Sequence, residues 1–148
     1  MYNLEKELVQ EFMFCLPYSS FSVLGPLKLA KEFNYNRGRV DVIALTGSKD
    51  IIAFEVKLKK WRSALHQAYR NTCFANYSYV IVPENIAKRA LMYSPEFDDR
   101  AVGLCYISDG NLVIAHEAAR SEPIQPWLSI QATETLTSGV GICRRRRT

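Results

Sequence analysis

Two apolar runs joined by a short polar segment constrain the fold of this chain more than any other feature. Residues 39–45 are Arg-Val-Asp-Val-Ile-Ala-Leu, and residues 51–58 are Ile-Ile-Ala-Phe-Glu-Val-Lys-Leu. Residues 46–50 between them are rich in turn formers. Apolar runs bounded by such a turn are typical of strands, so the two runs are predicted to form a β-hairpin.

The hairpin register decides what the two acids inside these runs can do. With the turn centred on Ser48, Leu45 faces Ile51 and Asp41 faces Glu55. Directly opposed side chains have Cβ atoms about 5 Å apart, and like charges placed there destabilise the pair. Acids in apolar strands are also costly unless something compensates them. A divalent metal would do so, because Mg²⁺ prefers oxygen ligands and keeps several waters. The prediction depends on this register, since a one-residue slip moves one carboxylate to the other face.

A lysine follows the second acid at the spacing of a shared strand face. Lys57 lies two residues beyond Glu55, hence on the same face and about 7 Å along the strand. There its ammonium group could stabilise the charge that builds on a phosphate during hydrolysis. Two metal-binding carboxylates beside a lysine therefore indicate phosphodiester chemistry. The alternative is that Asp41 and Lys57 are ordinary solvated positions on a half-exposed strand.

Length and composition predict one folded domain without a membrane span. The chain has 148 residues, of which 48% are hydrophobic, enough for a real core. We expect residues 1–120 to form this domain, and residues 121–148 to be an irregular extension with an arginine-rich end, of which residues 127–130 could pack back on the domain. No apolar run reaches the length of about eighteen residues that a membrane helix needs. The first residues lack a signal-peptide pattern, so the cytoplasm is the expected compartment. The four cysteines form no Cys-x-x-Cys pair, so no zinc site is expected.

The charge is distributed unevenly along the chain. Residues 28–70 carry ten Lys or Arg and four Asp or Glu, a net charge of +6. Residues 71–143 carry four basic and eight acidic residues, and four arginines follow at positions 144–147. The segment with the two carboxylates is therefore the basic one, which suits an anionic substrate such as nucleic acid.

The remaining patterns predict alternating helices and strands. Helices are expected at residues 3–14, 61–75 and 85–93, and strands at 39–45, 51–58, 77–82, 101–107 and 111–115. Asn3 is the expected cap of the first helix. Short strand pieces are expected at residues 23–24 and 27–29. A helix lies between the strands at 51–58 and 77–82, so a crossover with parallel pairing is expected. The fold class is thus α/β (α+β), with a central mixed β-sheet flanked by helices.

The pattern of these residues resembles a known nuclease superfamily. Asp41, then Glu55-Val56-Lys57, then Gln67-Ala68-Tyr69-Arg70 is similar to the PD-(D/E)xK superfamily, which includes restriction endonucleases and archaeal Holliday junction resolvases. The resemblance covers roughly residues 3–83 and implies a restriction-endonuclease-like fold. It departs from the motif at Val40, which stands where the motif has proline, although many members lack that proline.

The resemblance also implies roles for individual residues. Asp41, Glu55 and the Val56 carbonyl would bind Mg²⁺ or Mn²⁺, and Lys57 would position or activate the attacking water. Gln67 would brace Lys57 or contact a phosphate; the alternative is a solvent-facing helix glutamine. The first helix is similar to that of the resolvases, and there Glu5 is the best candidate for a third metal-binding carboxylate. Glu7 and Glu11 are the alternatives.

Basic and aromatic side chains around this segment are candidates for contact with nucleic acid. Phosphate contacts of this kind give affinity without sequence readout. The basic candidates are Arg37, Arg39, Lys59, Lys60, Arg62 and Arg70. Tyr35, Trp61 and Tyr69 could stack on bases, although core packing is the expected role of Trp61 and Tyr69.

The function predicted from the sequence is metal-dependent hydrolysis of phosphodiester bonds in DNA, with Asp41, Glu55, Lys57 and Gln67 as the catalytic set. The alternative is a non-catalytic nucleic-acid-binding module or subunit that keeps a nuclease-like fold. The sequence does not separate RNA from DNA as substrate. A homodimer is plausible because related enzymes pair two sites to cut two strands.

Overall fold

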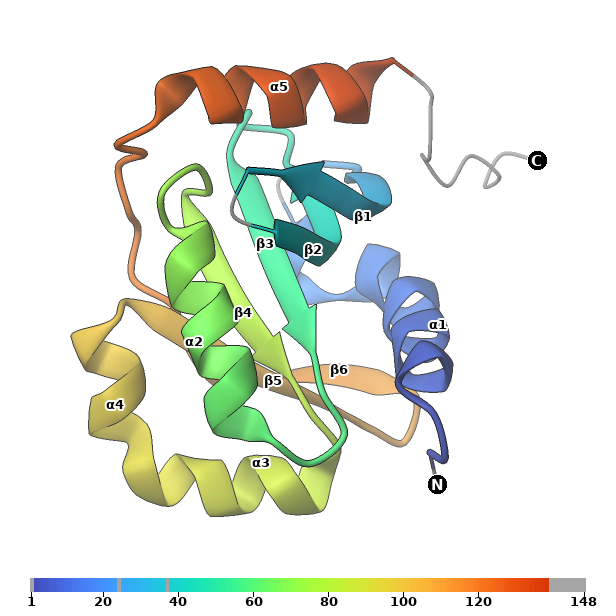
Figure 1. Cartoon of the computed structure of the whole chain (residues 1–148). Helices are drawn as coiled ribbons and strands as arrows, with labels where there is room; N and C mark the ends of the chain where they lie inside the picture. Colours follow the sequence, from blue (N-terminus) through green and yellow to red (C-terminus); the bar gives the residue numbers. More distant parts are fainter. Residues whose placement is uncertain (1, 24, 37, 139–148) are drawn as a thin grey trace.

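Six strands form one mixed sheet in the computed structural model, which describes residues 2–23, 25–36 and 38–138 (Figure 1). The strands are β1 (Lys28–Tyr35), β2 (Gly38–Leu45), β3 (Ile51–Val56), β4 (Tyr77–Ile81), β5 (Val102–Ser108) and β6 (Asn111–His116). The helices are α1 (Glu5–Cys15), α2 (Trp61–Asn71), α3 (Glu84–Ala90), α4 (Ser94–Asp99) and α5 (Pro126–Thr137), with 3-10 turns at Leu16–Tyr18, Ser20–Ser22 and Leu91–Tyr93.

The strands lie in sequence order across the sheet. β1, β2 and β3 pair antiparallel, β4 pairs parallel with both β3 and β5, and β6 returns antiparallel to β5. The helix α2 connects β3 to the parallel β4, as the order of elements predicts. The mixed sheet with flanking helices that the sequence predicts is thus confirmed.

The predicted register of the β2–β3 hairpin is also confirmed. Leu45 pairs with Ile51, and Val42 pairs with Phe54. The Thr46 amide donates to the Asp50 carbonyl at 2.9 Å and closes the turn. The same register, continued by one residue beyond the last ladder pair, places Asp41 opposite Glu55.

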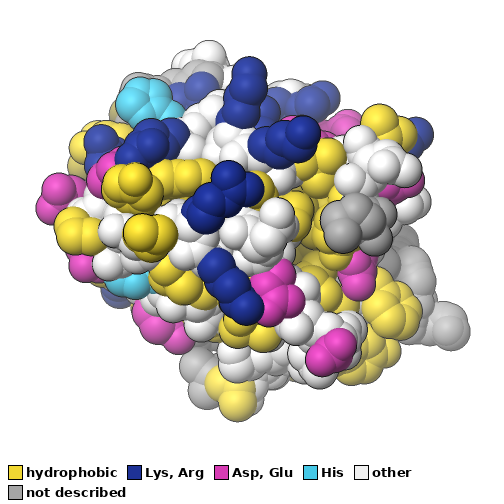
Figure 2. Space-filling model, turned by 90° about the horizontal axis from the view of Figure 1, so that it is seen from below, with side chains coloured by type: hydrophobic (Ala, Val, Ile, Leu, Met, Phe, Trp, Pro, Cys, Tyr) yellow, Lys and Arg dark blue, Asp and Glu magenta, His cyan; other side chains and the backbone are white. Residues whose placement is uncertain are grey.

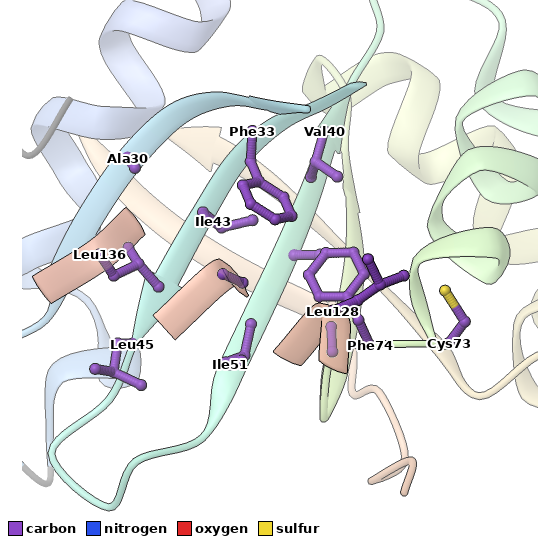
Figure 3. Packing of buried hydrophobic residues seen from close by; sticks show 13 residues of the cluster. Ala30, Phe33, Val40, Ile43, Leu45, Ile51, Cys73, Phe74, Leu128 and Leu136 are labelled. Carbon is purple, nitrogen blue, oxygen red and sulfur yellow. The ribbon is translucent and has the colours of Figure 1, made fainter. Parts of the chain in front are cut away.

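Alternating side chains of β2 and β3 build a core on each face of the sheet. Leu8 and Phe12 of α1 pack on one face. On the other face α5 covers β1 to β3, and its Leu128 and Leu136 lie in the same buried cluster as Ile43 (Figure 3). Farther along this second face, α2, α3 and α4 pack over β4 and β5. Glu55 lies on this second face, beside α2.

Three local predictions are wrong. The first helix has Leu4 as its N-cap instead of Asn3, because the Glu7 side chain reaches back to cap the helix: Glu7 Oε1 accepts from the amides of Asn3 at 2.7 Å and Leu4 at 3.1 Å. Of the two short strand pieces expected, the one at residues 27–29 is the start of the longer, eight-residue strand β1. At the other, residues 23–24, Val23 lies in a turn and Leu24 falls outside the described residues.

The third error concerns residues 121–148. The expected irregular extension contains the twelve-residue helix α5, whose Leu128, Ala132 and Leu136 are buried. These three side chains share a core cluster with β1, β2 and β3. Residues 126–137 therefore pack on the same sheet as the rest of the chain. The arginines at 144–147 lie outside the described residues.

Within the described residues, no helix combines the length and the apolar character that crossing a membrane requires.

Candidate functional site

A cleft of about 610 Å³ opens at the end of β3 where the two acids meet. We call it the carboxylate cleft. Eight of the residues predicted from the sequence line it: Glu5, Tyr35, Arg39, Asp41, Glu55, Lys57, Gln67 and Arg70. They come from α1, β1, β2, the end of β3 and α2, so the fold brings together residues as far apart in the chain as Glu5 and Arg70.

The two carboxylates occupy different environments. Glu55 is 1% exposed, whereas Asp41 is half-buried and its Oδ2 accepts a hydrogen bond from the Val56 amide at 2.8 Å. This bond ties β2 to the end of β3 one step beyond the last ladder pair. Burial raises the pKa of Glu55 to about 8, and the negative charge of Asp41 adds to the rise. A buried acid beside a second acid is poised to take up a cation, because a cation would favour its charged form.

A buried amide holds Glu55 in place. Asn71, at the end of α2, donates from Nδ2 to Glu55 Oε2 at 2.7 Å, and its Oδ1 accepts from the Tyr35 hydroxyl at 2.8 Å. Asn71 is completely buried. Neither residue was predicted as part of the catalytic set. The available signal was spacing, because Asn71 follows Gln67 by four residues and therefore shares its helix face.

Lys57 lies just past the end of β3. Its backbone amide donates to the Ile81 carbonyl at 3.1 Å, which continues the parallel pairing with β4 by one step. This bond keeps residues 55–57 extended, so the side chains of Glu55 and Lys57 enter the same cleft. The predicted sharing of one strand face is thus consistent with the structure.

Two polar groups on α2 have buried atoms that lack partners. Gln67 Oε1 and Arg70 Nε are shielded from solvent and make no hydrogen bond within the described residues. Such groups are exceptions in folded proteins and call for a physical reason. Gly38 makes room for Arg70, because a Cβ there would lie 3.0 Å from Arg70 Nη2. The two side chains are therefore held in the cleft with hydrogen-bonding capacity to spare.

The three acids of α1 separate into different roles. Glu5 lines the carboxylate cleft, as expected for the best candidate. Glu7 caps its own helix through the bonds described above, and Glu11 accepts a hydrogen bond from the Tyr2 hydroxyl. Glu5 is thus the one of the three that faces Asp41 and Glu55.

The predicted basic residues are divided between the cleft and the surface around it. Arg39 and Arg70 line the cleft, whereas Lys59 and Lys60 are exposed on the β3–α2 connection outside it. Arg62 lies apart, paired with Glu96 Oε2 at 2.8 Å. Figure 2 shows Lys and Arg side chains gathered on the end of the molecule that carries α3 and this connection. Arg37 lies outside the described residues.

The three aromatic candidates also differ. Tyr35 serves the hydrogen-bond network with Asn71. Trp61 is packed against Tyr93 and Phe97 with ring centroids 5.6 Å away in each case, so the prediction of core packing is confirmed. The same prediction is wrong for Tyr69, which is 52% exposed.

The donor set fits a hard divalent cation. Among the described residues, no three His, Cys, Asp or Glu side chains are close enough to form a metal site by themselves. Mg²⁺ does not require such a cage, because it commonly binds through one or two carboxylates together with waters and substrate phosphates. Asp41 and Glu55 can supply the carboxylates, and the Val56 carbonyl lies between them and Lys57 in the chain.

Comparison with known proteins supports the fold alone. No protein-family model matches the chain. No curated protein matches it either. The chain is similar in structure to a protein of unknown function from Silicibacter pomeroyi, with a TM-score of 0.60 and 20% sequence identity over 90% of this chain and 88% of that one. The mixed sheet with flanking helices is therefore an architecture shared with another protein.

Proposed function

We propose that this protein is a metal-dependent nuclease of the PD-(D/E)xK type that hydrolyses phosphodiester bonds in DNA. The observation that carries the proposal is the meeting of Asp41, Glu55 and Lys57 in one cleft, in the register that the hairpin pattern predicts. Like charges opposed on neighbouring strands destabilise the fold unless something compensates them. A bound cation is the compensation that this geometry supports best.

Asp41, Glu55 and the Val56 carbonyl would hold Mg²⁺ or Mn²⁺, with Glu5 as the additional carboxylate at the rim. When bound, the metal would supply charge stabilisation at the phosphate and lower the pKa of water. The remaining chemistry falls to the side chains of the cleft. The Lys57 ammonium group would orient the attacking water and stabilise the negative charge that grows on the phosphate oxygens.

The α2 residues would complete the site around the phosphate. Gln67 and Arg70 have unpartnered buried atoms at this cleft, and Arg39 adds a second guanidinium group. These groups can bind phosphate oxygens next to the scissile bond, which gives affinity without sequence readout. We propose DNA as the substrate in preference to RNA. We also propose a homodimer, in which two such clefts would act on the two strands of the DNA. The proposal also includes the cytoplasm as the compartment, in keeping with the free thiols of Cys15 and Cys105.

A second candidate is a non-catalytic DNA-binding module. The observation that favours it is the Asn71 amide, which satisfies Glu55 without any metal. Such a module would bind DNA through Arg39 and Arg70 and would cut nothing. A binding module does not explain why the carboxylates of Asp41 and Glu55 lie opposite each other in the cleft. The nuclease proposal explains this arrangement better.

Substitution of Lys57 tests the proposal directly. Purified protein would be incubated with linear duplex, single-stranded, branched and circular DNA and with RNA, in Mg²⁺, Mn²⁺ or EDTA. We expect cleavage that requires metal and that falls by about a hundredfold or more in Lys57→Ala, because a transition-state contact is lost. Lys28→Ala is the matched control: Lys28 is an exposed lysine that pairs with Leu45, at the far end of β2 from Asp41.

The possible results separate the two candidates. Parental cleavage rates in a folded Lys57→Ala variant would refute the proposed mechanism. A parent that binds DNA tightly and in a salt-sensitive manner, yet cuts no substrate with either metal, would favour the binding module.

A further inference from the structure

A second cleft, of about 730 Å³, shares two residues with the carboxylate cleft. Gln67 and Arg70 line both. On its far side the second cleft is bounded by Tyr69 and Ile124, and we call it the Tyr69 cleft. A ligand that passes Gln67 and Arg70 can therefore contact both clefts at once.

The outer wall of the Tyr69 cleft is fixed by backbone hydrogen bonds. The segment between β6 and α5 runs beside α2 (orange in Figure 1). The Ser121 amide donates to the Asn76 carbonyl at 2.7 Å, and the Gln125 amide donates to the Cys73 carbonyl at 3.0 Å. These bonds hold the segment against the end of α2. The cleft is a built feature of the fold, and its volume lies within the range of ligand sites, about 300–1,000 Å³.

The lining of the cleft combines an apolar surface with cationic groups. Tyr69 is 52% exposed and Ile124 is 78% exposed, and both border the cleft. Arg70, Arg100 and His66 also line it. Exposed aromatic and apolar surface beside guanidinium groups suits a flat ring attached to a phosphate.

The acid at the rim does not cancel this positive charge. Glu122 lines the cleft, but its Oε2 accepts a hydrogen bond from Arg120 Nε at 3.1 Å. Arg120 also pairs with Asp50 at 2.8 Å. Glu122, the acid that lines this cleft, is therefore engaged by Arg120. Arg100 Nη1 donates to the backbone carbonyl of Glu96 at 2.9 Å. A neutral carbonyl leaves the charge of Arg100 in place, so Arg70 and Arg100 can both face an anionic ligand at this cleft.

We infer that the Tyr69 cleft binds an unpaired nucleotide next to the phosphate that is held in the carboxylate cleft. Its base would stack on Tyr69 and Ile124, and its phosphate would lie near Arg70 and Arg100. Bases inside a duplex have both faces covered by their neighbours, so a single aromatic ring at the surface selects an unpaired base. The inference rests on the proposed nuclease function and deepens it: the substrate class is nucleic acid with a single-stranded, frayed or flapped segment at the cut.

The test measures binding in EDTA, where no cleavage can occur. Labelled single-stranded oligodeoxynucleotides, single-stranded oligoribonucleotides and blunt duplexes would be titrated with protein and followed by fluorescence anisotropy. We expect Tyr69→Ala to weaken single-strand binding about tenfold, the loss expected for one stacked base. Tyr69→Phe should bind as the parent does, because stacking needs the ring and not the hydroxyl. Tyr18→Ala, which removes an 83% exposed tyrosine elsewhere, is the control.

A second measurement uses the unaltered protein. A single-stranded oligonucleotide carrying 5-iodouracil would be irradiated with the protein, and the cross-linked residue would be identified by mass spectrometry. Cross-linking at Tyr69, in DNA or in RNA, supports the inference and shows which sugar the cleft accepts. Cross-linking that avoids α2 and residues 121–124 would overturn it.

The failure of this inference can be told apart from failure of the nuclease proposal. If the protein cuts DNA with metal and Tyr69→Ala changes neither single-strand binding nor the preference for unpaired substrates, the inference is wrong and the nuclease stands. If Tyr69→Ala weakens single-strand binding while no substrate is cut, the Tyr69 cleft stands and the nuclease proposal falls.

Discussion

Glu55 carries a titratable group in a position where ionisation is unfavourable. Burial, with the charge of Asp41, raises its pKa to about 8 in the folded protein, whereas the unfolded chain releases the same proton near pH 4.5. Between these values the folded state binds more protons than the unfolded state, so stability falls as pH rises. We expect the free energy of unfolding in EDTA, measured by urea titration, to decline from pH 5 to pH 8 and then level off. Glu55→Gln should flatten this decline and stabilise the protein at pH 8.

Glu7→Gln is the control, because Glu7 shifts in the opposite direction. Hydrogen bonds from the Asn3 and Leu4 amides lower the pKa of Glu7, so its contribution is complete above its unfolded value and is lost only at more acidic pH. Glu7→Gln should leave the slope between pH 5 and pH 8 unchanged. Added Mn²⁺ should raise stability most at high pH, because cation binding requires the deprotonated carboxylate. A parental slope in Glu55→Gln would contradict the prediction.

Asn71 is a residue whose loss should damage both stability and the site. Asn71→Ala removes the donor to Glu55 and the acceptor of the Tyr35 hydroxyl. Leaving a buried polar group without its partner costs about 1–3 kcal/mol. We expect a destabilisation of that size in chemical denaturation at pH 6, and a smaller one in Tyr35→Phe, which leaves the bond to Glu55 in place. Equal effects of the two substitutions would argue against the network.

At the scale of elements, the helix α5 is the part of the core that the sequence did not predict. Leu136 is completely buried against the sheet (Figure 3). Ile130 on the same helix is 60% exposed. Leu136→Ala should destabilise the protein by about 2–5 kcal/mol, as core truncations of leucine do. Ile130→Ala should have a much smaller effect. Thermal and urea unfolding would measure both, and similar effects of the two substitutions would show that α5 does not hold the core together.

The elements that were predictable share a clear local signal. The hairpin of β2 and β3 was predicted with its register, because two apolar runs flank one turn and centring that turn on Ser48 gives the observed pairs. The helix α2 was found because its apolar positions recur at helical spacing. Only the first residues of β1 were predicted, because Lys28, Lys31 and Glu32 interrupt its apolar pattern, and Glu32 has a φ of 58° where the ladder skips a pair. The fold resolves this conflict by placing β1 at the edge of the sheet, with its lysines exposed.

The same contrast holds for the candidate site. Asp41, Glu55 and Lys57 were predictable because strand spacing and register decide their positions, and these are local properties. Asn71 and Tyr35 were not, because their bond joins α2 to β1, thirty-six residues apart in the chain. The lining of the Tyr69 cleft was not predictable for the same reason: residues 121–125 are held by tertiary hydrogen bonds to Asn76 and Cys73, in the connection that follows α2. Local patterns thus predicted the two carboxylates and the lysine of the cleft but not the groups that hold them in place.

At the scale of the whole molecule, the basic side chains of residues 28–70 lie in different surroundings on the surface. Arg62 is bound to Glu96 at 2.8 Å, and its guanidinium group lies 4.3 Å from the Trp61 ring centroid. Arg39 is exposed in the carboxylate cleft. A cation that already has an anionic partner gains less from a phosphate than one that faces the solvent, because it must give up its existing partner. The formal charge of a segment therefore overstates the number of phosphate contacts that its side chains can make.

This difference predicts unequal roles for two arginines with the same formal charge. Arg39→Gln should weaken binding of duplex DNA in EDTA and lower the slope of log K against log salt by about one, the value for one lost phosphate contact. Arg62→Gln should leave both the affinity and the slope close to those of the parent. Anisotropy titrations at several salt concentrations would measure both quantities. If Arg62→Gln lowered the slope as much as Arg39→Gln, then Arg62 would leave Glu96 to bind DNA, and the DNA path would extend from the cleft across α2 toward α4.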